Sequence, residues 1–211
     1  MKQFWLVRHG QSEGNIDKPQ PYRGAPPLTP LGWQQVQTFA DNFEATPDLI
    51  VSSDFIRAQQ SAEPLQARFP HVPTETWPVQ EFTPLAKRYY EGVKMSSRRD
   101  AFLQFFSDAD PNVDNGEGAE SFTMGLQRAA DLLIRLQTIP QQTIVVYSHA
   151  TFLRLVYWAW LYGDVSRAAT GMTAFGMLLH SHKIPNTAFI HGVIELGKLH
   201  LSNIQTEHVH G

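Results

Sequence analysis

The stretch Phe4-Trp5-Leu6-Val7-Arg8-His9-Gly10 is an apolar run that stops at an arginine, a histidine and a glycine. Four consecutive apolar residues rich in strand formers predict a short buried strand over 4–7. A second run of this kind, Leu49-Ile50-Val51, ends in two serines. A third run, over 143–147, ends in Ser148-His149-Ala150. Three buried strands that each end in polar residues predict one sheet with a functional edge.

Helical segments alternate with these strands. Thr29-Pro30 is typical of a helix N-cap followed by proline at the first helical position, and the helix is predicted to run to about Glu44. This alternation predicts an α/β fold, a three-layer α/β/α sandwich with a mainly parallel central sheet and an antiparallel edge. Further elements are predicted as helices over 55–69, 121–136 and 151–162, a short strand over Val79–Phe82, and a hairpin over Ala188–Leu196 and Lys198–Ile204.

The segment at about 83–120 differs in character from the rest of the chain. It starts with basic and aromatic residues and ends in an acidic stretch rich in glycine and proline. Loops of this length inside a compact domain are often functional. We expect residues 1–211 to form one domain with this helical and loop insertion lying over the site as a lid.

Composition narrows the classes of function. Charged residues make up 18% of the chain and the formal net charge is −3, without the basic excess of a duplex nucleic-acid binder. There is no cysteine, which excludes disulfides and thiolate chemistry. The most hydrophobic stretch, Phe152–Tyr162, is interrupted by Arg154 and is too short to span a membrane. We expect a cytoplasmic protein that has no nucleic-acid or membrane partner and can form a homodimer.

Parallel strands would bring their carboxyl ends to one edge of the sheet, where ligands of open α/β sheets bind. His9, Arg8 and His149 would meet there, joined by Arg57 from the first turn of the helix that follows the second strand. Two histidines and two arginines beside helix N-termini suit a doubly charged phosphate. Each residue alone is weak evidence, and their shared placement carries the interpretation.

Five segments, taken in chain order, resemble the signature segments of the histidine phosphatase superfamily, also called the phosphoglycerate mutase-like family. Two features depart from the family pattern. Ala150 stands where many members have glycine, and the residues after Glu81 lack the run typical of the mutases. The similar segments are Arg8–Asn15, Leu28–Gln35, Ser52–Ala62, Gly118–Phe122 and Val145–His149.

The resemblance implies a role for each matching residue. His9 would be the nucleophile, with Arg8, Arg57 and His149 neutralising charge on the phosphoryl oxygens. Glu81 would be the general acid, because a carboxyl beside a phosphate dianion holds its proton more tightly; Glu13 and Glu91 are the alternatives. Substrate-binding roles are predicted for Asn15, the backbone N–H of Ala150, Arg23 and Gly24.

No cofactor and no metal are expected. The pairs His180/His182 and His208/His210 have the spacing of metal ligands, but no carboxylate cluster accompanies them, so we interpret them as tail or hairpin residues. The predicted function is a metal-independent phosphomonoester hydrolase that acts through a phosphohistidine on a small phosphorylated metabolite. The alternatives are a cofactor-dependent phosphoglycerate mutase and a non-catalytic binder of phosphorylated ligands with the same fold.

Overall fold

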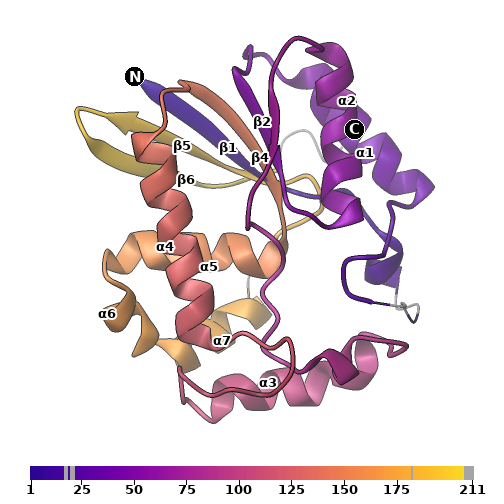
Figure 1. The fold of residues 1–211 in the computed structure, drawn as a ribbon, viewed down its shortest axis with the longest axis vertical. Helices are drawn as coiled ribbons and strands as arrows, with labels where there is room; N and C mark the ends of the chain where they lie inside the picture. The colour runs from indigo at the N-terminus through magenta and orange to yellow at the C-terminus, as the bar shows by residue number, and fades with distance from the viewer. Residues whose placement is uncertain (17–18, 20–21, 182, 207–211) are drawn as a thin grey trace.

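A six-stranded sheet forms the centre of the computed structural model, which describes residues 1–16, 19, 22–181 and 183–206 (Figure 1). Its strand order is β3-β2-β4-β1-β5-β6. β1 and β2 both pair in parallel with β4, β3 pairs in parallel with β2, and β5 and β6 add an antiparallel edge. The predicted mixed sheet is therefore confirmed. The strands are β1 (Lys2–Arg8), β2 (Leu49–Ser52), β3 (Thr74–Thr76), β4 (Thr143–Ser148), β5 (Phe189–Glu195) and β6 (Lys198–Gln205).

Helices lie on both faces of this sheet. Figure 1 shows α1 and α2 on one side, and α4 to α7 gathered on the other. Short 3-10 turns η1 (Glu13–Ile16), η2 (Lys87–Tyr89) and η3 (Ser96–Arg98) complete the described elements. The helices are α1 (Pro30–Asn42), α2 (Ile56–Arg68), α3 (Arg99–Ser107), α4 (Phe122–Thr138), α5 (Ala150–Tyr162), α6 (Val165–Ala169) and α7 (Met172–Ser181).

The side chains of β1 alternate between the two faces of the sheet, and the core has one half on each face. Phe4 and Leu6 are fully buried in the half that contains α4 and α5. Val7 points to the opposite face, where it packs in one cluster with Phe39 of α1 and Leu65 of α2. Successive side chains of a strand face opposite sides, so apolar residues on both faces require a helical layer on each. The three-layer sandwich predicted from the sequence is confirmed.

The strand predicted over Val79–Phe82 is wrong. Val79 and Phe82 are buried core residues, but their backbone is irregular, and the Val79 carbonyl accepts from the Ser148 hydroxyl at 2.6 Å instead of from a neighbouring strand. The third parallel strand is Thr74–Thr76, whose residues are all exposed. An exposed polar edge strand has no apolar pattern by which periodicity can identify it.

The segment 83–120 is divided between the core and the site. Phe105 and Phe106 of α3 are buried, and the Phe106 ring lies 5.8 Å from that of Phe175 in α7. A side chain at Gly176 would collide with Phe106, which shows how closely α3 packs on α7. The residues before α3 line the cavity described below. The insertion thus supplies both a buried helix and a wall of the site.

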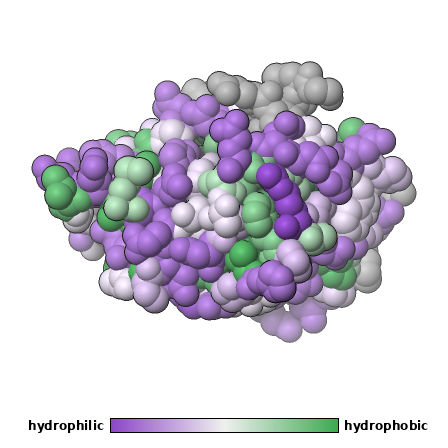
Figure 2. All heavy atoms as spheres, turned by 90° about the horizontal axis from the view of Figure 1, so that it is seen from above, coloured by the Kyte–Doolittle hydropathy of each residue, from purple (hydrophilic) through white to green (hydrophobic). Residues whose placement is uncertain are grey.

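The surface at the end opposite α3 combines hydrophilic and hydrophobic residues. Figure 2 views the molecule from above, from the end opposite α3 in Figure 1, and shows mainly hydrophilic residues with smaller hydrophobic patches among them. Within the described part of the chain, no helix combines the length and the apolar character that crossing a bilayer requires.

Candidate active site

The ends of three neighbouring parallel strands bring the predicted residues together. β1 and β4 are adjacent and in register, with Arg8 opposite Ser148, so His9 and His149 follow the ends of paired strands. Their ring centroids are 5.0 Å apart. β2 lies on the other side of β4, and Arg57 stands in the first turn of α2 that follows it. The convergence that the sequence predicted is present in the fold.

The hydrogen bonds of His9 fix its tautomer. Its Nδ1 lies 2.6 Å from the Gly10 carbonyl oxygen, which can only accept, so Nδ1 carries the proton. Nε2 accepts from Arg57 Nε at 3.1 Å and therefore presents a lone pair. Burial, followed by the positive charges of Arg57 and Arg8, holds the pKa of His9 well below its ordinary value. His9 is a neutral imidazole with an unprotonated Nε2.

Backbone contacts hold the loop that carries His9. The His9 N–H donates to the Ser148 carbonyl of β4 at 3.0 Å, and the Asn186 side-chain amide donates to the His9 carbonyl at 2.9 Å. The next N–H, at Gly10, donates to the Ser61 hydroxyl of α2 at 3.0 Å. Contacts from β4, from α2 and from the turn at Asn186 therefore position the loop that carries the imidazole.

Arg8 and Arg57 bring positive charge into the buried site. Burial lowers the pKa of each guanidinium to about 10, so both remain cations at neutral pH. Arg57 Nη1 donates to the Arg23 carbonyl at 2.9 Å, and its guanidinium lies over the Phe55 ring. Arg8 donates to the Ile184 carbonyl, while its Nε has no hydrogen-bond partner among the described residues. Buried cations with unused donors favour an anionic ligand.

His149 is held by a serine that the sequence analysis did not assign. The Ser53 hydroxyl lies 2.7 Å from His149 Nε2, and the Phe55 ring packs edge-on against the imidazole. Nδ1 is buried and has no hydrogen-bond partner in the described structure. Burial, and then the charge of Arg57, lower the pKa of His149 well below its ordinary value. His149 is therefore neutral in this structure, whereas the charge-neutralising role expected from the sequence requires a cation.

Glu81 lies at the N-terminus of α5. Its Oε1 accepts from the backbone N–H groups of Phe82, Thr151 and Phe152 at 3.0, 3.1 and 2.9 Å. Oε2 has one longer contact, 3.3 Å from Thr151 N. Because Oε1 is fully engaged with the helix terminus and Glu81 lines the cavity, Oε2 is the oxygen available to a ligand.

Arg8, His9, Arg57 and Glu81 line a cavity of about 130 Å³, and the fully buried His149 lies behind His9 without forming part of the wall. Asn15 and Arg23 line it, and their substrate-binding roles stay predictions. The side-chain Oδ1 of Asn15 accepts from Ser12 N at 3.0 Å, which leaves the side-chain NH₂ group as the donor for a ligand. Ala150 and Gly24 are not part of the wall, and their roles stay predictions. The wall is formed by Arg8, His9, Ser12, Gly14, Asn15, Arg23, Pro26, Phe55, Arg57, Glu81, Thr83, Tyr90, Val93, Met95 and Arg98.

The cavity wall also contains residues that the sequence gave no specific role. In the segment before α3, Tyr90 follows η2 and Arg98 ends η3, and the Arg98 guanidinium lies 4.6 Å from the centroid of the Tyr90 ring. Burial raises the pKa of Tyr90 to about 12, so its phenol stays protonated. Their basic and aromatic character was visible in the sequence, but only the fold of the segment decides which of its side chains face the cavity.

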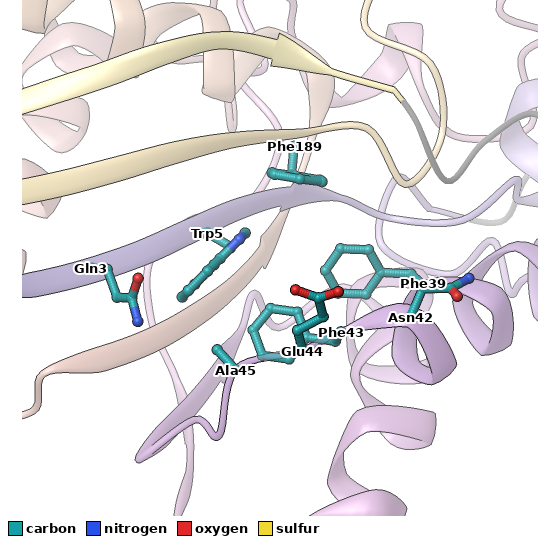
Figure 3. A pocket seen from close by; sticks show the side chains of 8 residues that line it. All are labelled: Gln3, Trp5, Phe39, Asn42, Phe43, Glu44, Ala45 and Phe189. Atoms are coloured by element: carbon teal, nitrogen blue, oxygen red, sulfur yellow. The ribbon is translucent and has the colours of Figure 1, made fainter.

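A wider hollow of about 740 Å³ lies elsewhere, between the sheet and the end of α1 (Figure 3). Figure 3 shows the rings of Trp5, Phe39, Phe43 and Phe189 with the Glu44 carboxylate among them. Within the described structure this wall contains a carboxylate and no cationic side chain. A phosphate dianion would be repelled there, so size does not identify the functional cavity.

The two histidine pairs are the metal-ligand candidates that the sequence offers. His182, His208 and His210 lie outside the described residues, as does the side chain of His180. Among the residues that the structure does describe, no group of three or more histidine, aspartate or glutamate side chains is arranged to hold a metal ion.

Known proteins share this sequence pattern and fold. Residues 4–183 match the model of the histidine phosphatase superfamily (branch 1). The chain is 28% identical over 164 residues to the adenosylcobalamin/alpha-ribazole phosphatase of Escherichia coli (strain K12), covering 72% of this chain and 76% of the relative. The Salmonella typhimurium protein of the same name is also 28% identical, over 166 residues, with the same shares covered.

Solved structures agree on the fold. The phosphoserine phosphatase from Entamoeba histolytica, in complex with 3-phosphoglyceric acid, has a TM-score of 0.74 at 21% sequence identity, over 99% of this chain and 100% of that one. The family match covers most of the chain, from the first strand to the segment that follows α7. The chain therefore belongs to the histidine phosphatase superfamily.

Proposed function

We propose that this protein is a phosphomonoester hydrolase in which His9 receives the phosphoryl group and then passes it to water. The observation that carries the proposal is the fixed tautomer of His9. Its proton is held on Nδ1 by the Gly10 carbonyl, and Nε2 keeps its lone pair beside two buried arginines. A neutral imidazole nitrogen next to cations is the state that a phosphorus nucleophile needs.

In the first step, His9 Nε2 attacks phosphorus as the bond from phosphorus to the leaving oxygen breaks. Arg57 Nε, which contacts Nε2 in the ligand-free site, transfers its hydrogen bond to a phosphoryl oxygen. Arg8 binds a second oxygen through its unused donor. Fixed donors of this kind supply most of the rate in phosphoryl transfer, because charge on the equatorial oxygens is neutralised without reorganisation.

Glu81 gives its proton to the departing oxygen through Oε2. The resulting carboxylate is stabilised by the three N–H groups at the start of α5. In the second step this carboxylate takes a proton from water, whose oxygen attacks phosphorus while the Nε2–phosphorus bond breaks. Phosphate leaves, and His9 and Glu81 return to their starting protonation states.

His149 acts on the same phosphoryl group. It is neutral in the ligand-free site, and a dianion beside it favours its protonated form, because an opposite charge raises the pKa of an imidazole. Ser53 holds the ring through Nε2, and Nδ1 has no hydrogen-bond partner in the described structure. His149 thus supplies positive charge only when substrate is present.

The substrate is a small phosphorylated metabolite whose leaving group contacts Phe55, Tyr90, Val93 and Met95. These side chains give the cavity an apolar and aromatic wall beside the arginines. Relatives with this family pattern are named for alpha-ribazole phosphate, and a structural neighbour for phosphoserine. Those compounds and 3-phosphoglycerate form the first panel of candidate substrates.

Release of inorganic phosphate tests the proposal. The purified protein is incubated with nitrophenyl phosphate, 3-phosphoglycerate and the other panel members, each with and without excess chelator. We expect phosphate release from nitrophenyl phosphate and at least one metabolite, at a rate that chelator leaves unchanged because arginines carry the charge. Binding without release would mean a non-catalytic binder, and conversion of 3-phosphoglycerate to its isomer without phosphate release would mean a mutase.

A further inference from the structure

The backbone that carries Glu81 has no regular structure. Residues 77–83 lie outside every helix and strand, between the edge strand β3 and the segment before η2. A proton donor must be held within a fraction of an ångström of its productive position, and irregular backbone does not supply that by itself. Side chains from elsewhere must therefore position this segment.

Arg128 of α4 binds the segment on one side of Glu81. Its Nη1 donates to the carbonyl oxygens of Pro78 and Gln80 at 3.1 and 2.7 Å. Glu120 binds the other side, where its Oε2 accepts from the Thr83 N–H at 3.1 Å. The Glu120 N–H also donates to the Thr83 carbonyl at 2.8 Å.

Arg128 and Glu120 are in turn fixed to each other. Arg128 Nε donates to Glu120 Oε1 and Nη2 donates to Oε2, both at 2.9 Å. The two side chains are only 12% and 15% exposed. A bidentate pair of this kind sets orientation as well as distance, and a lysine cannot reproduce it because an ammonium lacks the planar fork.

The same arginine also contacts the helix terminus that binds the Glu81 carboxylate. Its guanidinium lies 4.2 Å from the centroid of the Phe152 ring. The Phe152 N–H is one of the donors to Glu81 Oε1, at 2.9 Å. Arg128 thus touches both the backbone that carries Glu81 and the residue that anchors its oxygen.

We propose that Arg128 and Glu120 form a brace that positions Glu81 for proton transfer to the leaving group. The brace acts only through Glu81, so these are positioning residues and not catalytic ones. The inference rests on the proposed function, since it needs Glu81 to be the proton donor.

Leaving-group dependence separates positioning from a general structural role. An alkyl phosphate leaves as a strongly basic alkoxide and needs a proton, whereas nitrophenyl phosphate leaves as a weak base and needs little help. Arg128→Lys and Glu120→Gln should each slow phosphorylation by an alkyl phosphate about 10-fold or more, because small misplacements of a catalytic group are costly. Phosphorylation by nitrophenyl phosphate, measured in single turnovers, should change far less.

The chain provides a matched control seven residues further along α4. Arg135 Nη2 lies 3.0 Å from Glu75 Oε2, and the guanidinium stacks on Trp77 with 3.9 Å to the ring centroid. This pair ties α4 to β3 without bonding to the backbone on either side of Glu81. Arg135→Lys should leave the rate ratio of the two substrates at the wild-type value, with denaturant unfolding used to compare the stability of all variants.

Two double variants complete the test. If the brace acts through Glu81, then adding Arg128→Lys or Glu120→Gln to Glu81→Gln should cause no further loss with the alkyl phosphate, since coupled residues are not additive. Equal loss on both substrates, or additive loss in the double variants, would overturn the brace. Glu120→Gln keeps the side chain's size and carries the test if Arg128→Lys folds poorly. Detection of phosphohistidine in the wild-type protein tests the proposed function separately. If phosphohistidine forms, equal or additive losses in the variants count against the brace alone.

Discussion

His9 and His149 are neutral in a buried site that also holds two arginines, and this has a consequence for stability. Both histidines have a pKa well below the ordinary value in the folded protein, because burial and the neighbouring cations oppose protonation. In the unfolded chain each would titrate near 6.5. Between those values the unfolded state binds more protons than the folded state, so acid favours unfolding.

The free energy of unfolding should therefore fall as the pH is lowered from 7 to 5. The contribution is fully present above about pH 6.5 and is lost as the pH falls toward the folded-state pKa, by up to roughly 1.4 kcal/mol per histidine and pH unit. Denaturant unfolding at several pH values measures the slope. Substituting both His9→Gln and His149→Gln should flatten it.

The exposed His71 provides the control. His71→Gln should keep the wild-type slope, because this side chain is exposed and is not part of the buried site. A steep slope that survives in the double variant would mean that other groups cause the acid sensitivity and that the two active-site histidines are not held neutral.

The central residues of the site could be predicted because each follows the end of a buried strand or opens the next helix. His9, Arg57 and His149 meet through parallel strand topology, which periodicity already indicates. Ser53 and Tyr90 received no specific role, because a serine or a tyrosine at such positions has no distinctive spacing. Which side chain turns toward the cavity depends on tertiary packing and not on local pattern.

At the scale of elements, α1 packs on the loop after His9 at two glycines. A Cβ atom on Gly32, in the first turn of α1, would lie 2.0 Å from the Gln11 carbonyl oxygen. A Cβ on Gly10 would lie 2.6 Å from the Gly32 carbonyl oxygen. The helix therefore sets the position of the loop that carries His9.

Gly32→Ala should therefore affect both stability and catalysis. We expect a loss of about 1–3 kcal/mol in unfolding free energy, typical of overpacking, and a phosphorylation rate lower by roughly 10-fold or more because His9 is displaced. Denaturant unfolding and single-turnover kinetics with nitrophenyl phosphate measure the two effects.

Gly192→Ala is the matched control. Gly192 of β5 pairs with Phe4 of β1, and a Cβ there would lie 2.1 Å from Phe4 Cζ. This variant should lose stability while its phosphorylation rate stays near the wild-type value. Equal rates in the two variants would show that the contact of α1 with the His9 loop does not matter for catalysis.

Elements with a buried face could be predicted from sequence, and exposed or irregular ones could not. β1, β2 and β4 are apolar runs covered on both faces, and α1 begins at its predicted cap, where Thr29 accepts from Gly32 N. β3 is short, polar and exposed, so its place in the sheet is decided by backbone pairing with β2 alone. The strand wrongly predicted over Val79–Phe82 has apolar residues, but it is bounded by prolines and its backbone bonds go to side chains and turns.

At the scale of the whole molecule, the layers follow from burial on both faces of the sheet, and the sequence was sufficient to predict them. The 83–120 insertion was harder, because its residues combine a helix packed on α7 with a wall of the cavity. The hydrophobic pattern of the insertion identifies α3 as the buried part only when the surface of α7, on which it packs, is known. That residues 1–211 form a single domain stays a prediction.

The proposed function requires a covalent phosphoryl group at His9, and capture of that intermediate tests the proposal most directly. The wild-type protein is mixed with substrate labelled in the phosphoryl group and quenched rapidly without acid, and the labelled residue is identified by mass spectrometry. The label should be found on His9, in a linkage that acid cleaves and base does not, and His9→Ala should form none. Label on a serine, or full activity in His9→Ala, would contradict the account.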